Sequence, residues 1–260
     1  MDEDLLKPFL EHPEGAGLYL DFDGTLSHIA LRPSDARPLE GVTEVLGRLA
    51  DRYRVVAIVS GRSATELLEW LGPGVEIWGT HGAERSENGR VSLSQRAAPF
   101  AELMRVVERE AAAGLERLAL EGVVLEDKGV MLGLHFRAAA DVEEARVRLD
   151  ELAEELAGRH GLLRAGGRLA YELRPPIELT KRVVVLDRTR ELGLEAACFV
   201  GDDVVDLPAF DALDTLAGEG VTGLRVGVDS DEAPPELLER ADLVVSGPEG
   251  ALELLRRLDQ

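Results

Sequence analysis

The chain has 260 residues, 45% of them apolar, which is enough for one large domain or two smaller ones around a full core. Its net charge of -21 makes nucleic acid and anionic membrane surfaces poor partners, and a bound phosphate would need a metal ion or local positive charge. No apolar run approaches the roughly 20 residues of a membrane span, and the acidic residues 2–4 argue against a signal or transit peptide, so a cytoplasmic location is expected.

The first predicted strand, residues 18–22, runs into two aspartates, Asp21 and Asp23, followed by Gly24. Because strand side chains alternate between faces, the two carboxylates point the same way, about 6–7 Å apart. Carboxylates so placed repel each other unless a cation lies between them or one is protonated. Gly24 permits a turn, after which backbone N–H groups can face an anion. This stretch therefore predicts a metal and phosphate site with a carboxylate available as nucleophile.

The next part of the chain alternates helix and strand. After a loop over residues 27–38, the spacing of apolar side chains predicts a helix over 39–51. The apolar run 55–59 is rich in β-branched residues, which is typical of a strand buried on both faces, and a third strand is expected over 75–78. This alternation indicates a parallel sheet with helices on both faces, and such sheets bind ligands beyond the carboxyl ends of their strands.

Polar residues follow the second of these strands where it ends. Ser60, Gly61 and Arg62 come directly after the strand. Ser63 and Glu66 then form a capping-box pattern, which predicts the start of the next helix. Since the two aspartates and Ser60 follow strands of one parallel sheet, we expect them to meet at the same edge of that sheet.

The middle of the chain has a different pattern. A helix over residues 98–119 is followed by a strand pair around Asp127-Lys128-Gly129, and an amphipathic helix over 142–160 by a strand pair around Gly166-Gly167. Helix, hairpin, helix, hairpin is typical of an antiparallel α+β unit. The expected domains are an α/β core of residues 1–97 and 175–260 and an inserted α+β cap of residues 98–174.

The core then resumes with a buried strand over residues 196–200. Lys181 precedes it at the start of a helix, and an acidic cluster, Asp202 to Asp206, directly follows it. Only three of the 29 basic residues are lysines, which suggests that Lys181 is retained for its compact ammonium group. The remaining predicted elements are helices over 206–216 and 249–258 and strands over 224–228 and 243–245.

Four polar clusters thus fall at predicted element boundaries, in the order Asp21 with Asp23, Ser60, Lys181 and Asp202. An aspartate pair alone would be a weak signal, because acidic residues are common in loops, but all four clusters together are specific. In these motifs the chain resembles the haloacid dehalogenase superfamily of phosphohydrolases over essentially its whole length. The resemblance implies a three-layer α/β/α core with an inserted cap.

The same resemblance implies a role for each matching residue. Asp21 would attack phosphorus and carry an aspartyl-phosphate, and Asp23 would protonate the leaving oxygen and then activate water. Ser60 would hydrogen-bond a phosphate oxygen, and Lys181 would neutralise charge on the phosphate and the nucleophile. This chemistry needs an in-line nucleophile, charge compensation and a hard cation. The implied Mg²⁺ site comprises Asp21, the backbone carbonyl of Asp23, and Asp202, supported by Asp203 and Asp206.

Further motifs narrow the resemblance to trehalose-6-phosphate phosphatases. They are Ser60-Gly61-Arg62, His81-Gly-Ala-Glu84, Glu126-Asp-Lys128-Gly, His135-Phe-Arg137 and Glu172-Leu-Arg174-Pro. The family activity would be hydrolysis of trehalose 6-phosphate to trehalose and phosphate, with a trehalose-phosphate synthase only as a neighbour in the pathway. The cap would supply the sugar contacts. The implied substrate-binding residues are Gly61, Arg62, Glu126, Lys128, Glu172 and Arg174.

Some positions depart from the family pattern or have a simpler interpretation. Val205 and Leu207 replace a Thr and a Glu of the family pattern. Met131 stands where a serine is frequent, and this departure concerns sugar specificity. Lys181 lies in Thr-Lys-Arg where the family commonly has Asp-Lys-Gly. Glu126 and Lys128 would also suit a solvated hairpin turn, and Arg62 and Arg174 would suit surface ion pairs. His81 and His135 are expected to be structural hydrogen-bonding residues.

Three alternatives remain open. Another sugar-phosphate phosphatase of the superfamily would act, for example, on sucrose phosphate or a mannosyl-phosphoglycerate. A phospho-accepting signalling domain would use a similar set of Asp, Ser or Thr, and Lys residues. The second aspartate, Asp23, and the insertion of ~75 residues, far longer than an ordinary loop, argue against it. A catalytically inactive sugar-phosphate sensor is the third alternative, and the intact core motifs argue against it.

Overall fold

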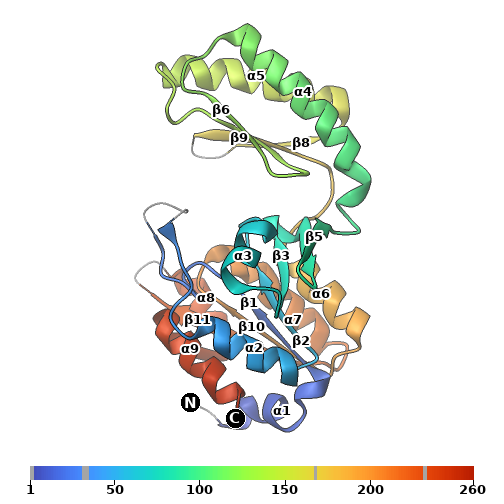
Figure 1. Cartoon of the computed structure of the whole chain (residues 1–260), viewed down its shortest axis with the longest axis vertical. Helices are drawn as coiled ribbons and strands as arrows, with labels where there is room; N and C mark the ends of the chain where they lie inside the picture. The colour runs from blue at the N-terminus through green and yellow to red at the C-terminus, as the bar shows by residue number, and fades with distance from the viewer. Residues whose placement is uncertain (1–2, 31–34, 167–168, 231–232) are drawn as a thin grey trace. The chain divides into compact units, whose positions relative to one another are not determined.

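The computed structural model describes residues 3–30, 35–166, 169–230 and 233–260. The chain divides into two compact units, a core unit of Met1–Ser92 with Leu179–Gln260 and an inserted unit of Leu93–Glu178 (Figure 1). Part of the predicted loop 27–38 and Gly167 of the second predicted hairpin lie outside the described residues. Within the described ranges, no helix combines the length and apolar character needed to cross a membrane.

An eight-stranded sheet forms the centre of the core unit, in the order β12-β11-β10-β1-β2-β3-β4-β5. The strands from β12 to β3 are parallel, and β4 is antiparallel to β3. This confirms the predicted parallel sheet and places the first strand at its middle. The strands are β1 (Ala16–Leu20), β2 (Val55–Val59), β3 (Glu76–Gly79), β4 (Glu84–Glu87), β5 (Arg90–Leu93), β10 (Ala196–Gly201), β11 (Thr222–Asp229) and β12 (Leu243–Ser246).

Helices cover both faces of this sheet because its central strands are apolar on both sides. Leu18 and Leu20 of β1 belong to one buried cluster with residues of α1, α2, α3 and α9, whereas Tyr19 belongs to another with residues of α6, α7 and α8. The core is therefore a three-layer α/β/α unit (Figure 1). The helices are α1 (Glu3–Glu11), α2 (Val42–Arg52), α3 (Ala64–Leu71), α6 (Lys181–Leu192), α7 (Leu207–Ala217), α8 (Pro235–Arg240) and α9 (Gly247–Leu258).

The inserted unit is a four-stranded antiparallel sheet in the order β6-β7-β9-β8, with two helices on one face (Figure 1). Leu132 and Leu134 of β7 and Leu173 of β9 are fully buried, which identifies the face that the helices cover. Its elements are α4 (Ala101–Leu118), β6 (Val124–Asp127), β7 (Leu132–His135), α5 (Val142–His160), β8 (Leu163–Gly166) and β9 (Ala170–Arg174).

The element boundaries differ from the predictions at a few places. Strand β1 ends at Leu20 and not at Phe22, because the Phe22 carbonyl accepts the N–H groups of Leu26 and Ser27 at 2.8 and 3.1 Å and so closes a turn. The hairpin of β4 and β5 was not predicted, although Asn88-Gly89 between them is a strong turn signal; both residues have positive φ. Helix α8 was missed because its six residues are too few to show a helical repeat of apolar positions.

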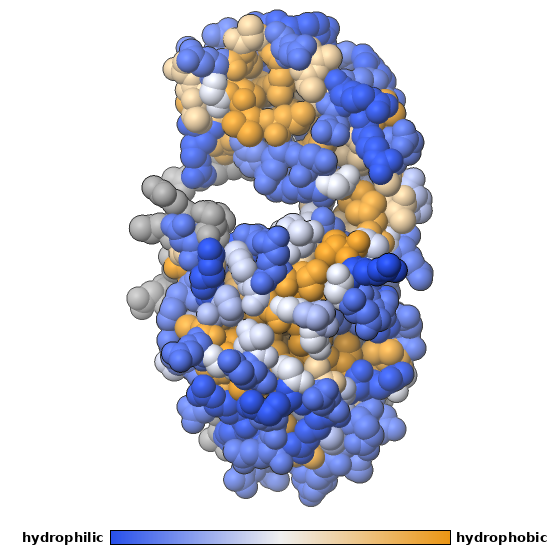
Figure 2. Space-filling view, viewed as in Figure 1, coloured by the Kyte–Doolittle hydropathy of each residue, from blue (hydrophilic) through white to orange (hydrophobic). Residues whose placement is uncertain are grey.

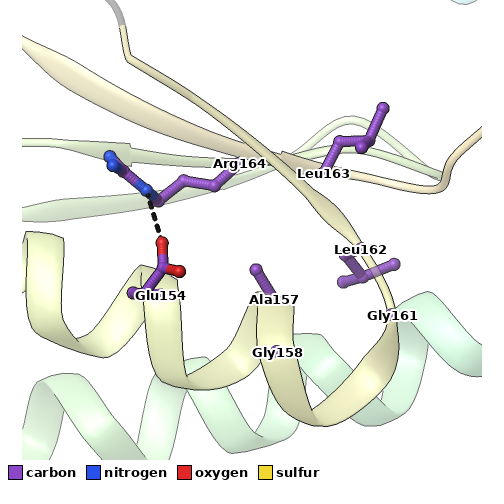
Figure 3. Close-up of a pocket in the computed structure, with 7 residues that line it drawn as sticks. All are labelled: Glu154, Ala157, Gly158, Gly161, Leu162, Leu163 and Arg164. Atoms are coloured by element: carbon purple, nitrogen blue, oxygen red, sulfur yellow. Dashed lines mark hydrogen bonds and ion pairs between the residues drawn. The ribbon is translucent and has the colours of Figure 1, made fainter.

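Hydrophilic side chains cover much of the surface seen in Figure 2, in keeping with the net charge of -21. A hollow of about 520 Å³ lies in the inserted unit between α5 and β8 (Figure 3). The Arg164 guanidinium donates to Glu154 at 3.1 Å at its rim, and Leu162 and Leu163 add apolar side chains. The residues that line it include no predicted site residue.

Candidate active site

The predicted site residues of the core unit follow neighbouring strands. Leu20 of β1 pairs with Val200 of β10 on one side and Ile58 of β2 on the other. Asp21, the next residue of the chain, donates its N–H to the Val200 carbonyl at 2.9 Å. The carboxyl ends of these parallel strands therefore bring Asp21, Asp202 and Ser60 to one edge of the sheet, as the alternation of elements predicted.

Three buried carboxylates meet at this edge. Asp21, Asp202 and Asp206 each offer an oxygen within 4.8 Å of the others, and all three are at most 5% exposed. Burial raises the pKa of Asp202 to about 7, and the charge of Asp206 adds to the increase. Burial also raises the pKa of Asp21; Lys181 opposes this rise, while Asp206 and Asp202 add to it. The pocket thus holds more carboxyl groups than cations, and the raised pKa values show that it disfavours further negative charge.

Lys181 is the cation at the centre of this cluster. It is the first residue of α6, after the N-cap Thr180, and its side chain is 2% exposed. Its ammonium group donates to Oδ1 of Asp21 and to Oδ1 of Asp206, both at 2.6 Å. Burial alone would lower the pKa of Lys181, but the two carboxylates raise it above its usual value. Lys181 therefore stays charged and holds Asp21 in place.

The remaining contacts separate the roles of the carboxylates. Oδ1 of Asp206 accepts from Lys181, and Oδ2 accepts the N–H groups of Asp202 and Asp203 at 3.0 and 3.1 Å. Asp202 accepts from the Thr25 hydroxyl at 3.3 Å, a contact that sequence reasoning missed. Among the described residues, Asp206 is thus committed to structure, and Asp21 and Asp202 keep carboxylate oxygens for a hard cation, which prefers oxygen ligands.

Asp203 lies apart from this cluster. Its side chain is exposed and accepts the N–H of Val204 at 2.5 Å, which caps the short 3-10 helix Val204–Asp206. Val205, where the family pattern has Thr, is also exposed. Leu207, the first residue of α7, is buried in the apolar cluster between α7 and the core sheet. The Leu207 departure therefore serves packing of the core.

Asp23 and Arg62 form a bidentate ion pair. Nε and Nη2 of Arg62 donate to the two carboxylate oxygens of Asp23 at 2.7 and 2.8 Å, and Nη1 donates to Glu66 at 3.1 Å. The guanidinium also lies over the ring of Trp70, 5.0 Å from its centroid. Arg62, expected to contact substrate, is thus engaged with Asp23. Glu66 completes only half of the predicted capping box: its N–H donates to Ser63 at 3.2 Å, but its carboxylate pairs with Arg62.

Backbone contacts organise the segment after β2. Ser60 is 1% exposed, and its hydroxyl accepts the N–H of Arg62 at 3.2 Å. A Cβ on Gly61 would lie 3.0 Å from the His81 ring, so the glycine allows that ring to pack against the turn. The His81 ring therefore packs against the turn after β2, and the hydrogen-bonding role expected of it stays a prediction.

The other predicted substrate-binding residues lie in the inserted unit. The Lys128 ammonium is 3.5 Å from Oε2 of Glu126 and 3.5 Å from Oε1 of Glu172, so the three side chains form one cluster. Nε of Arg174 is buried and has no hydrogen-bond partner in the part of the chain that the structure describes. His135, which was not among the predicted site residues, contacts Oε2 of Glu126 at 2.7 Å.

Gly24 makes the close approach of the two acidic strand ends possible. Its φ is +74°, and a Cβ there would lie 1.9 Å from Oδ2 of Asp202. We expect Gly24→Ala to lower the free energy of unfolding by about 1–2 kcal/mol through backbone strain at positive φ, and by at least as much again through the clash, because buried Asp202 cannot move away. The matched control is Gly193→Ala, with φ of +63° and nothing within 4 Å of the new Cβ. Equal shifts of the urea midpoint in both variants would contradict the clash.

Solved structures of similar fold define the class of protein. A haloacid dehalogenase-like hydrolase from Bacteroides thetaiotaomicron has a TM-score of 0.64 and 16% identity, covering 94% of this chain and 99% of that chain. A trehalose-6-phosphate phosphatase from Aspergillus fumigatus has a TM-score of 0.68 and 25% identity, covering 100% and 97%. The parallel core sheet with its inserted α+β unit is thus the fold of haloacid dehalogenase-like hydrolases, as predicted.

The sequence comparisons narrow this class. The family model described as trehalose-phosphatase matches residues 19–236, and the chain belongs to this family. The trehalose-phosphate phosphatase of Mycobacterium avium (strain 104) is 35% identical over 260 residues, which is 95% of this chain and 62% of the relative. That of Mycobacterium leprae (strain TN) is 34% identical over 208 residues, or 75% and 47%. The chain thus spans less than two thirds of the length of these relatives.

Proposed function

We propose that this chain is a phosphatase that hydrolyses trehalose 6-phosphate to trehalose and orthophosphate through an aspartyl-phosphate on Asp21. The observation that carries the proposal is the buried Asp21, held 2.6 Å from the Lys181 ammonium beside Asp202, in a member of the trehalose-phosphatase family. A carboxylate held by a charged lysine at the end of a central strand is suited to attack phosphorus.

In the proposed reaction, a carboxylate oxygen of Asp21 attacks phosphorus in line with the sugar oxygen. The bond between phosphorus and the sugar oxygen breaks as the new bond to Asp21 forms, and Asp23 gives a proton to the departing sugar oxygen. Asp23 then takes a proton from a water molecule that attacks phosphorus, which releases orthophosphate and restores Asp21. Lys181 and Ser60 offset or hydrogen-bond the charge on the phosphoryl oxygens.

Arg62 would act in this reaction through Asp23. Both carboxylate oxygens of Asp23 accept from its guanidinium, and the third guanidinium nitrogen, Nη1, donates to Glu66. The Arg62 guanidinium also packs over the Trp70 ring, so contacts on several sides hold it in one position. Because a carboxylate with both oxygens engaged in this way carries no proton, one of these contacts must open before Asp23 can donate one. We therefore assign Arg62 to orienting Asp23, and Gly61 to shaping the turn beside it.

We infer that Mg²⁺ is the metal of this site. The excess of buried carboxylates fits a hard divalent cation. Asp21, Asp202 and the backbone carbonyl of Asp23 would hold it, and Asp206 and Asp203 would support them through their contacts with Lys181 and with the backbone. When bound, Mg²⁺ would neutralise charge on the carboxylates and the phosphoryl oxygens.

The inserted unit would supply sugar recognition through Glu126, Lys128 and Glu172. Carboxylates accept hydrogen bonds from sugar hydroxyls, and an ammonium group donates to their oxygens. All three side chains are partly exposed, and the Lys128 ammonium lies 3.5 Å from a carboxylate oxygen of each glutamate. A cluster of this kind presents alternating acceptors and donors, which suits a polyhydroxyl ligand.

Lys128→Ala is expected to reduce kcat/KM for trehalose 6-phosphate by about 10- to 100-fold, since a charged hydrogen bond of roughly 1.5–3 kcal/mol is lost. A small activated ester such as p-nitrophenyl phosphate should be affected little, because it has no sugar to hold. Phosphate release from the two substrates is the measurement. Lys7→Ala is the control, since Lys7 lies exposed on α1 beside Glu11. Equal losses on both substrates would remove Lys128 from sugar recognition.

The proposed function is tested by measuring orthophosphate release from a panel of sugar phosphates. The panel comprises trehalose 6-phosphate, sucrose 6-phosphate and mannosyl-phosphoglycerate, each with Mg²⁺ and with a chelator. Multiple turnovers on trehalose 6-phosphate that stop with chelator would support the proposal. A clear preference for another sugar phosphate would overturn the substrate, and a single stoichiometric burst would favour a phospho-accepting signalling domain.

A further inference from the structure

The open face of the inserted sheet carries a hydrogen bond that the proposed function does not yet use. Leu132, Leu134 and Leu173 are buried on the face that the helices cover. Because strand side chains alternate, Gly133 and His135 of β7 lie on the opposite face. Gly133 pairs in register with Glu126 of β6 and with Glu172 of β9, so this face brings all four residues together.

Gly133 leaves a space on this face that the ring of His135 occupies. A Cβ on Gly133 would lie 2.6 Å from Nε2 of His135 and 3.4 Å from Oε2 of Glu126. The backbone of Gly133 is ordinary strand, without the positive φ that favours glycine. The residue is therefore needed for space, because any side chain there would displace the His135 ring.

The ring in this space orients one carboxylate. Nε2 of His135 is 2.7 Å from Oε2 of Glu126, and since a carboxylate only accepts, Nε2 carries the proton and donates. Lys128 contacts the same oxygen at 3.5 Å. Within the described chain, both contacts of Glu126 thus fall on Oε2, which leaves Oε1 available to accept a further hydrogen bond.

We propose that His135 is a positioning residue for the sugar part of the substrate, and that Gly133 provides the space for its ring. His135 holds the Glu126 carboxylate in one orientation, so that Oε1 meets a sugar hydroxyl without first losing rotational freedom. This inference rests on the proposed function and adds two residues to its recognition site. The ligand class is a polyhydroxyl sugar carrying a phosphomonoester.

The test measures, for each variant, the change in KM for the preferred sugar phosphate and the change in kcat/KM for p-nitrophenyl phosphate. His135→Ala should raise KM for the sugar phosphate about five- to tenfold, the worth of one hydrogen bond, and leave the small ester unchanged. His135→Gln, whose amide can still donate to Glu126, should recover part of the loss. Gly133→Ala should resemble His135→Ala. Gly166→Ala in β8 is its control, because a Cβ there meets nothing within 4 Å, and should leave both values unchanged.

A double variant separates positioning from direct contact. In a Glu126→Gln background, His135→Ala should have little further effect on KM, because the carboxylate that it orients is gone. A full additional loss would show that His135 touches the sugar itself and would overturn the inference, as would equal losses on the sugar phosphate and the small ester. If the wild-type protein prefers a sugar phosphate other than trehalose 6-phosphate, only the proposed substrate fails, and the same comparison is made with the preferred one.

Discussion

Asp21→Asn is expected to abolish turnover, with kcat reduced on the order of 10⁴-fold or more, because the amide cannot attack phosphorus. Asn has nearly the same shape as Asp, so the core sheet should remain folded. Asp21 is 5% exposed beside Asp202 and Asp206, and burial raises its pKa, so the neutral amide of Asn is tolerated in this pocket, where Lys181 keeps its contact with Asp206. The urea midpoint of the metal-free protein should therefore change little.

The measurement is orthophosphate release over many enzyme equivalents, together with trapping of phosphorylated protein after acid quench. The wild-type chain should yield an acid-stable phosphoprotein with the label on Asp21, and the variant none. Asp51→Asn is a suitable control, because it makes the same chemical change on an exposed face of α2. Retained turnover in the Asp21 variant would remove Asp21 from the nucleophile position.

Lys181→Met is expected to lower both stability and activity. The ammonium is 2% exposed and contacts Asp21 and Asp206 at 2.6 Å each, so its loss leaves buried carboxylates without a partner. Removing one member of a buried ion pair typically costs about 3–5 kcal/mol in the free energy of unfolding. Activity should fall by about 10²–10³-fold as well, because charge on the phosphoryl oxygens is no longer offset.

Two further variants define the reason for this loss. Lys181→Met with Asp206→Asn should regain part of the stability, since one uncompensated charge is removed, but no activity. Lys181→Arg should not rescue either property, because a planar guanidinium cannot replace a compact ammonium between two buried carboxylates. Stability is measured by urea unfolding of metal-free protein. An unchanged midpoint in Lys181→Met would contradict the buried ion cluster.

Much of the fold follows from local patterns of the chain. The β-branched run of β2 (Val55–Val59) and the amphipathic helix α5 (Val142–His160) were predicted to the residue, because apolar spacing and caps depend on neighbours in sequence. The hairpin of β4 and β5 was missed because its strands, Glu84–Glu87 and Arg90–Leu93, are too polar to show a buried pattern. Only its Asn-Gly turn would have indicated it.

The sequence by itself determined which strand-end clusters meet, because carboxyl ends of parallel strands share one edge of a sheet; Asp21, Ser60 and Asp202 could be placed there in advance, whereas Lys181, at the start of a helix, was placed by the family resemblance. Only the tertiary structure decided which partners these groups choose. Asp206 accepts hydrogen bonds from Lys181 and from two backbone N–H groups, and Asp23 accepts from Arg62. The side chain of Asp203 is exposed. The physical reason is that the two properties depend on different parts of the chain. The pattern of neighbouring residues decides on which edge of the sheet a side chain lies. Whether a hydrogen bond forms, in contrast, depends on differences of a few tenths of an ångström in the distance between two atoms. Those atoms can belong to residues far apart in sequence, such as Thr25 and Asp202.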